Sequence, residues 1–178
     1  MSLSNSILSL NVRGLREAKK RREIFQWLKQ YHKGKDSIIF LQETHSTALD
    51  LTSWERDWGS KVIMSHGTSN SRGVAILLPI NYNFEIQNST VSTDGRKITL
   101  NILCDEIEYC LINVYAPTQD LENEQIQFIN YLRLDIEQNI EKKLIIGGDF
   151  NIPLENIDKS NGTVNNSKSR IQMNQLLD

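Results

Sequence analysis

The chain has 178 residues, of which 39% are hydrophobic and 24% are charged, and this composition suits one domain with a sizeable core. Its net charge of −2 excludes attachment to nucleic acid through bulk positive charge, so any such contact must be local. No apolar run approaches the roughly 20 residues of a membrane span and no targeting signal is visible, so we expect an intracellular protein without a membrane partner.

Strands and helices alternate at the start of the chain. Short apolar runs predict strands over residues 7–12 and 37–41. The helical spacing of Ile24, Trp27, Leu28 and Tyr31 predicts an amphipathic helix over 16–32 with these residues on its apolar stripe. A shorter helix that carries two tryptophans is expected over 46–58.

Adjacent strands dominate the middle of the chain, and helices return towards the end. The expected strands are 61–65, 73–79, 84–91, 97–103, 108–115 and 143–149. A hairpin turn is predicted at Asp94-Gly95, helices over 120–140 and from 169 onwards, and a polar loop over 155–168. This mixture predicts α/β layers with mixed sheets. Cys104 and Cys110 lie in strand-like surroundings and are interpreted as reduced core thiols.

Polar residues collect where four of the predicted strands end. These residues are Asn11, Gln42-Glu43, Asn113 with Tyr115, and Asp149 with Asn151. Asp149 and Asn151 share a face if the strand continues. Sites in open α/β sheets form outside the carboxyl ends of strands, so these side chains could converge. Oxygen ligands of this kind suit Mg²⁺, and a metal beside a carboxylate can activate water. A single strand-end Asp or Asn is more often a turn or cap residue, so the interpretation depends on the whole set.

Five sequence motifs, in this order and at these separations, carry a resemblance. They are "SLNVRGL", "IIFLQETHS", "SRGVAILLP", "INVYAPT" and "IIGGDFNIPL". Together they resemble the endonuclease/exonuclease/phosphatase superfamily, and most closely the apurinic-like endonuclease domain of LINE-type (non-LTR) retrotransposons. The likeness covers essentially all of the chain.

The resemblance implies a fold, an activity and partners. The fold is an α/β (α+β), four-layer αββα sandwich of the deoxyribonuclease I-like type. Residues 1–178 would form the N-terminal three quarters of that domain, with the last strands of the second sheet absent. The activity is that of a Mg²⁺-dependent phosphodiesterase, with Mn²⁺ as substitute, that nicks double-stranded DNA. In the family this module is normally fused to a downstream reverse transcriptase, and it acts in the nucleus.

The resemblance also assigns roles to individual residues. Glu43 matches the principal Mg²⁺ ligand, and Asn11 matches an amide near the metal and the scissile phosphate. Tyr115 matches the residue that positions the phosphate. Asp149 matches the acid that orients or deprotonates the attacking water, and Asn151 matches the amide that holds the phosphate oxygens.

One part of the family pattern has no match before Asp178. The family completes its site with a later Asp and His, and His32, His45 and His66 do not match that histidine. His45, two residues after Glu43, is a possible substitute, although a loop or cap role is favoured. The alternatives are therefore a catalytically incomplete fragment or remnant of the domain, or an abasic-site repair endonuclease of the same superfamily.

Two groups of basic residues are candidates for DNA contacts. Arg13, Arg72 and Arg96 flank predicted strands, and we expect them to bind DNA phosphates and supply local positive charge. The run "KKRR" at 19–22 is compatible with phosphate contact or nuclear import, but the solvated face of an amphipathic helix is the favoured interpretation.

Overall fold

The computed structural model describes residues 6–31, 37–118, 121–154 and 167–177. The chain divides into two compact units. The first comprises Met1–Tyr115 and Glu141–Asp149, and the second comprises Ala116–Ile140 and Phe150–Asp178. Within the described ranges, no helix combines the length and apolarity that crossing a membrane would require.

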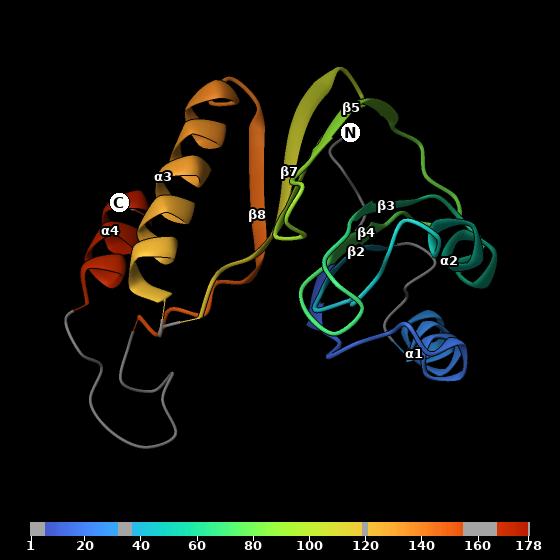
Figure 1. The fold of residues 1–178 in the computed structure, drawn as a ribbon. Coiled ribbons are helices and arrows are strands. Elements are labelled where there is room, and N and C mark those ends of the chain that lie inside the picture. Colours follow the sequence, from blue (N-terminus) through green and yellow to red (C-terminus); the bar gives the residue numbers. More distant parts are fainter. Residues whose placement is uncertain (1–5, 32–36, 119–120, 155–166, 178) are drawn as a thin grey trace. The chain divides into compact units, whose positions relative to one another are not determined.

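The first unit contains a four-stranded sheet with helices on one face (Figure 1). The strand order is β1-β2-β4-β3, from β1 (Ser6–Asn11), β2 (Ser37–Gln42), β3 (Val62–Ser65) and β4 (Val74–Leu77). Helix α1 (Ala18–Tyr31) connects the parallel strands β1 and β2, and α2 (Leu51–Trp58) follows β2. Trp54, Trp58 and Phe25 are buried between these helices and the sheet, with Phe25 edge-on to both indoles.

Strand β2 is buried on both faces, and its side chains belong to two separate cores. Ile39 and Leu41 pack with the helices, whereas Ile38 and Phe40 pack against a second sheet. Because strand residues alternate between faces, a continuous apolar run is what a doubly covered strand requires.

The second sheet of the first unit has the order β5-β6-β7-β8. Its strands are β5 (Glu85–Val91), β6 (Lys97–Cys104), β7 (Ile107–Tyr115) and β8 (Lys143–Asp149). The first three are antiparallel, with the predicted turn at Asp94-Gly95 confirmed, and β8 runs parallel to β7. Both cysteines are buried and free, as predicted.

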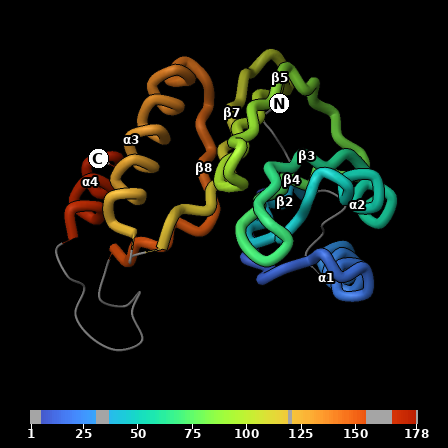
Figure 2. Tube along the Cα trace, viewed as in Figure 1, coloured from blue at the N-terminus to red at the C-terminus, as the bar shows by residue number. Residues whose placement is uncertain are grey.

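The second unit contains α3 (Glu122–Gln138) and α4 (Lys168–Leu177), which pack against each other (Figure 2). Ile129 and Leu132 are buried on α3 and Met173 is buried on α4. The first unit alone therefore forms three layers of the expected sandwich, with α1 and α2 on one sheet and the second sheet behind it. Helices α3 and α4 belong to the second unit, so the fourth layer of the expected sandwich stays a prediction.

All the predicted strands and helices are present, but two details of the prediction were wrong. The helix expected from residue 46 begins at Leu51, because Asp50 folds back to accept hydrogen bonds from the amide and hydroxyl of Thr47. On α1 the buried face includes Arg21, Phe25 and Leu28, while Trp27, expected on the apolar stripe, is 41% exposed. Most of the loop expected over 155–168 lies outside the described residues.

Candidate active site

The strand register brings polar residues of both sheets to the ends of neighbouring strands. In the first sheet Asn11 at the end of β1 pairs with Gln42 of β2, so Glu43 comes one residue beyond. In the second sheet Tyr115 at the end of β7 pairs with Asp149 at the end of β8. The register therefore places the four polar strand ends named from the sequence side by side in two pairs, one pair in each sheet.

The side-chain amide of Asn11 joins two carboxylates. Its Nδ2 donates to Glu43 Oε1 and to Asp149 Oδ2, both at 2.8 Å. Its Oδ1 accepts a hydrogen bond from the amide of Arg13 at 3.1 Å, and this fixes which end of the side chain carries the nitrogen. The two carboxylates, which are far apart in sequence, are thus held beside each other by one donor.

Tyr115 contributes a phenol to the same group. Its hydroxyl donates to Glu43 Oε1 at 3.1 Å. Burial raises the pKa of Tyr115 to about 12, and the negative charge of Glu43, its hydrogen bond and the charge of Asp149 act in the same direction, partly opposed by Arg96. Tyr115 is therefore a neutral hydrogen-bond donor at physiological pH.

Glu43 reaches this group through an unusual backbone conformation. A regular continuation of β2 would place Glu43 on the helix side of the sheet with Leu41. Instead Glu43 has a φ of +54°, and its carbonyl accepts a hydrogen bond of 2.6 Å from the amide of Gly14. Left-handed backbone at a non-glycine residue is costly and concentrates at functional sites.

A buried amide network supports the site from within, and sequence reasoning gave it no role. Asn113 has no exposed surface, and its Nδ2 donates to the carbonyls of Leu41 and Ala75 in the first sheet. Its Oδ1 accepts from Gln42 Nε2 at 2.8 Å. The amide therefore ties the two sheets together next to Glu43 and Tyr115. The sequence feature that could have predicted this network is an asparagine within an otherwise apolar strand, because a buried amide must find hydrogen-bond partners.

The donor set fits a hard divalent cation. Glu43 and Asp149 supply carboxylate oxygens, and among the described residues Glu43 Oε2 accepts no hydrogen bond. No described group of three or more His, Cys, Asp or Glu side chains could hold a metal. Mg²⁺ does not require one, since it is usually bound by one or two carboxylates and keeps several waters. Asn11 turns its nitrogen towards the carboxylates, so its role as a metal ligand stays a prediction.

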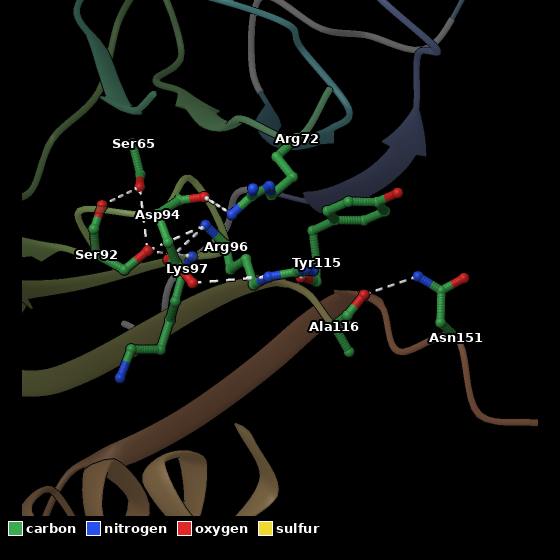
Figure 3. Close-up of polar contacts among 9 residues, drawn as sticks. All are labelled: Ser65, Arg72, Ser92, Asp94, Arg96, Lys97, Tyr115, Ala116 and Asn151. Atoms are coloured by element: carbon green, nitrogen blue, oxygen red, sulfur yellow. Dashed lines mark hydrogen bonds and ion pairs between the residues drawn. The ribbon is translucent and has the colours of Figure 1, made fainter. Parts of the chain in front are cut away.

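Two of the predicted DNA-contacting arginines converge on the β5–β6 turn (Figure 3). Arg72 donates to the carbonyl of Asp94 at 3.5 Å, and Arg96 pairs with the Asp94 carboxylate at 3.6 Å. Arg96 also lies over the ring of Tyr115, 5.8 Å from its centroid, and donates to the Tyr115 carbonyl. Ser92 orders this turn by accepting from the amides of Arg96 and Lys97. Positive charge is therefore present beside the phenol.

The third predicted arginine, Arg13, has an exposed side chain, while its backbone amide donates a hydrogen bond to Asn11 Oδ1.

For the basic run at 19–22, the solvated-face interpretation was wrong at two positions. Arg21 is 3% exposed and forms a buried ion pair of 2.6 Å with Asp57, and Lys20 donates to three backbone carbonyls. Burial and backbone partners occupy these two cations, so neither is placed for contact with DNA.

The described histidines have local partners. The ring of His45 packs over Gly14, where an added Cβ would lie 2.9 Å from Nδ1. Among the described residues, this ring makes no hydrogen bond to Glu43 or Asp149. His66 Nδ1 hydrogen-bonds Ser46 Oγ at 3.1 Å, and burial lowers the pKa of His66, partly opposed by Asp50. His32 lies outside the described residues.

Asn151 belongs to the second unit. Its Nδ2 donates to the Ala116 carbonyl at 2.8 Å (Figure 3), and its own carbonyl accepts from Gln125. Strand β8 ends at Asp149, and Asn151 has a φ of +51°, so the expected shared face with Asp149 does not follow from an extended strand. Its role as a phosphate-binding amide stays a prediction.

Comparison with known proteins adds a relative and several similar folds. The chain is 35% identical over 156 residues to the "Transposon TX1 uncharacterized 149 kDa protein" of Xenopus laevis, covering 87% of this chain and 12% of that protein. Among solved structures, an AP endonuclease from Leishmania major matches with a TM-score of 0.77 at 13% identity, over 97% of this chain and 66% of that one. An AP endonuclease from Archaeoglobus fulgidus matches with a TM-score of 0.73 at 20% identity, over 97% and 70%.

A further match is TDP2 of D. rerio complexed with a single-strand DNA product, with a TM-score of 0.63 and 18% identity, over 84% of this chain and 61% of that one. These similarities establish a fold of the deoxyribonuclease I-like type, as the sequence motifs predicted. The sequence profile described as "Endonuclease/Exonuclease/phosphatase family" matches residues 8–170. The chain belongs to the endonuclease/exonuclease/phosphatase family.

Proposed function

We propose that this chain is the endonuclease module of a retrotransposon polyprotein and nicks double-stranded DNA as a divalent-metal-dependent phosphodiesterase. The observation that carries the proposal is the contact group of Asn11, Glu43, Asp149 and Tyr115, in which one amide bonds two carboxylates from different sheets and one phenol bonds the Glu43 carboxylate. Similarity to the transposon protein favours the mobile-element context. Action in the nucleus and fusion to a reverse transcriptase are parts of the same proposal.

The contacts give each residue a task. Glu43, which has an oxygen that accepts no bond from the described residues, would hold the metal, and members of the family generally use a divalent metal. Such a metal would polarise a phosphate oxygen and neutralise developing charge. Asp149 would orient or deprotonate the attacking water, which requires an ionised carboxylate. Tyr115, neutral at physiological pH, would turn its one hydroxyl proton from Glu43 to the phosphate when Glu43 holds the metal.

Positive charge near Tyr115 supports DNA as the substrate. Arg96 lies against the Tyr115 ring, and Arg72 reaches the same turn. Because the protein is acidic overall, a local pair of arginines would have to supply the phosphate contacts. Arg13 would add a third contact from its exposed side chain.

The test is nicking of supercoiled plasmid with Mg²⁺, Mn²⁺ or EDTA. We expect metal-dependent nicking that Glu43→Gln and Asp149→Asn each reduce by at least about 100-fold, as expected when residues act as a unit. Glu23→Gln removes an exposed acid on α1 and should change nothing. Metal binding without nicking would instead favour the catalytically incomplete alternative.

Abasic-site repair is the second candidate, because two of the similar solved structures are AP endonucleases. A duplex oligonucleotide with one abasic site, compared with the same duplex with an intact base, separates the two functions. Equal rates on both substrates support the mobile-element role, whereas cleavage confined to the abasic duplex supports repair.

A further inference from the structure

The turn after β1, residues Val12 to Leu15, has most of its amides paired with Gln42 at the end of β2 and with the two residues that follow it. The amides of Val12, Gly14 and Leu15 donate to the carbonyls of Gln42, Glu43 and Thr44. The remaining amide, that of Arg13, donates to Asn11 Oδ1. The turn is therefore fastened both to the strand that delivers Glu43 and to the side chain that joins the two carboxylates.

The carbonyls of the same turn converge on one side chain from α1. Lys20 Nζ donates to the carbonyls of Val12 and Arg13 at 3.0 Å and of Gly14 at 2.7 Å. An ammonium group has three protons, so these three bonds use its full donor capacity. Consecutive left-handed residues, Arg13 with a φ of +46° and Gly14 with a φ of +85°, shape the turn whose carbonyls share this cation. Left-handed backbone at a non-glycine residue persists only when its surroundings hold it in place.

We infer that Lys20 is a positioning residue for the carboxylate pair. It acts through the turn, because the turn presents the Arg13 amide to Asn11 Oδ1, which leaves Asn11 Nδ2 to face Glu43 and Asp149. Without the ammonium group, three carbonyls lose their shared donor and the strained turn can relax. The Asn11 amide is then free to rotate, and the carboxylates lose the donor that holds them together. The effect on the metal rests on the proposed function, whereas the effect on the Asn11 amide does not.

The experiment compares Lys20→Met with Lys19→Met, a matched control at the preceding, exposed lysine of the same helix. The first readout is the side-chain amide resonance of Asn11 in ¹⁵N-labelled protein, assigned by its loss in Asn11→Asp. The second is the affinity for Mn²⁺ alone, measured by the paramagnetic signal of the free ion. Plasmid nicking is the third readout.

In Lys20→Met we expect the Asn11 resonances to shift and broaden and the Mn²⁺ affinity to fall by about tenfold, the usual effect of losing a residue that orients a metal ligand. Lys19→Met should match the parent in both. Unchanged Asn11 resonances in a folded Lys20→Met variant would overturn the inference. If the parent does not nick DNA but its Asn11 resonances depend on Lys20, the proposed function fails and the positioning role stands.

Lys20→Arg keeps a cation near the turn, and it is the second variant in case Lys20→Met does not fold. The planar guanidinium cannot place three protons on the three carbonyls as the ammonium does. We therefore expect intermediate shifts of the Asn11 resonances. An arginine variant indistinguishable from the parent, together with an unfolded methionine variant, would show that charge alone matters and would reject the positioning role.

Discussion

Replacing Glu43 with Gln should stabilise the fold while removing metal binding. Two bonds of 2.8 Å to one nitrogen hold the carboxylates of Glu43 and Asp149 within about 6 Å of each other, where two unit charges repel by about 3 kcal/mol at an effective dielectric of ~20. Both groups are only partly buried, so solvent reduces this to about 1 kcal/mol. Glutamine keeps an oxygen at Oε1 for Asn11 and Tyr115 and removes the charge.

The assay is urea unfolding followed by the fluorescence of the buried tryptophans, in EDTA and in saturating Mg²⁺. In EDTA, Glu43→Gln should unfold with a free energy about 1 kcal/mol higher than the parent, as is common when a functional site trades stability for activity. Mg²⁺ at 100 times its dissociation constant should stabilise the parent by about 2.7 kcal/mol and the variant by much less. The order of stability should therefore reverse.

Two results would refute this reasoning. Loss of stability in EDTA would mean that the carboxylate is paired rather than repelled in the metal-free fold. Equal stabilisation of parent and variant by Mg²⁺ would place the bound ion elsewhere. Glu23→Gln is the control, because it removes one negative charge from an exposed position on α1.

Three further predictions follow from individual contacts. Spectrophotometric titration should show one phenol that ionises near pH 12. This ionisation should be missing in Tyr115→Phe and should move to lower pH in Glu43→Gln. Because folding raises the pKa of Tyr115, its contribution to stability is present below pH ~10 and is lost as pH rises through the folded-state pKa. Asp57→Ala should lower the free energy of unfolding by about 3–5 kcal/mol in urea melts, since it leaves Arg21 buried without its ion pair. Gly148→Ala should prevent or strongly destabilise folding, seen by circular dichroism, because a Cβ there would collide with the backbone of β7.

Each of these has an outcome that would contradict it. A Tyr115 phenol that ionises near its ordinary value would mean that its hydroxyl is neither buried nor hydrogen-bonded to Glu43 in solution. An Asp57→Ala variant as stable as Arg22→Ala, a change at an exposed neighbour of Arg21, would mean that the ion pair is not buried in solution. A Gly148→Ala variant with parental stability would show that β7 and β8 are less closely spaced.

The sequence pattern was sufficient for the elements and for the identity of the candidate site residues. Continuous apolar runs such as that of β2 specify doubly covered strands, and helical spacing specifies α1 and α3. The motif order predicted the family, and the family match over residues 8–170 confirms it. Local pattern carries this information because backbone preference and the spacing of apolar residues are properties of near neighbours along the chain.

Periodicity was less reliable for the direction of side chains at strand ends. Asn11, Tyr115 and Asp149 follow the alternation of their strands, but Glu43 lies on a left-handed residue that alternation does not anticipate. The same limit applies to Lys20 and Arg21, for which the helical pattern favours a solvated face. Whether a long cationic side chain faces solvent or a buried partner depends on what the adjoining turn or helix offers.

By itself, then, the sequence determined the strand and helix composition, the family and the residue types that meet in the site, because these depend on local chemistry and on motif order. The tertiary structure decided which partner each polar group takes. In the folded chain the Asn11 amide donates to both carboxylates, and the Asn113 amide donates to carbonyls of the opposite sheet. Lys20 donates to three carbonyls of the turn after β1. Most of these pairings join residues distant in sequence, and buried polar groups accept whichever partner the packing brings within about 3 Å.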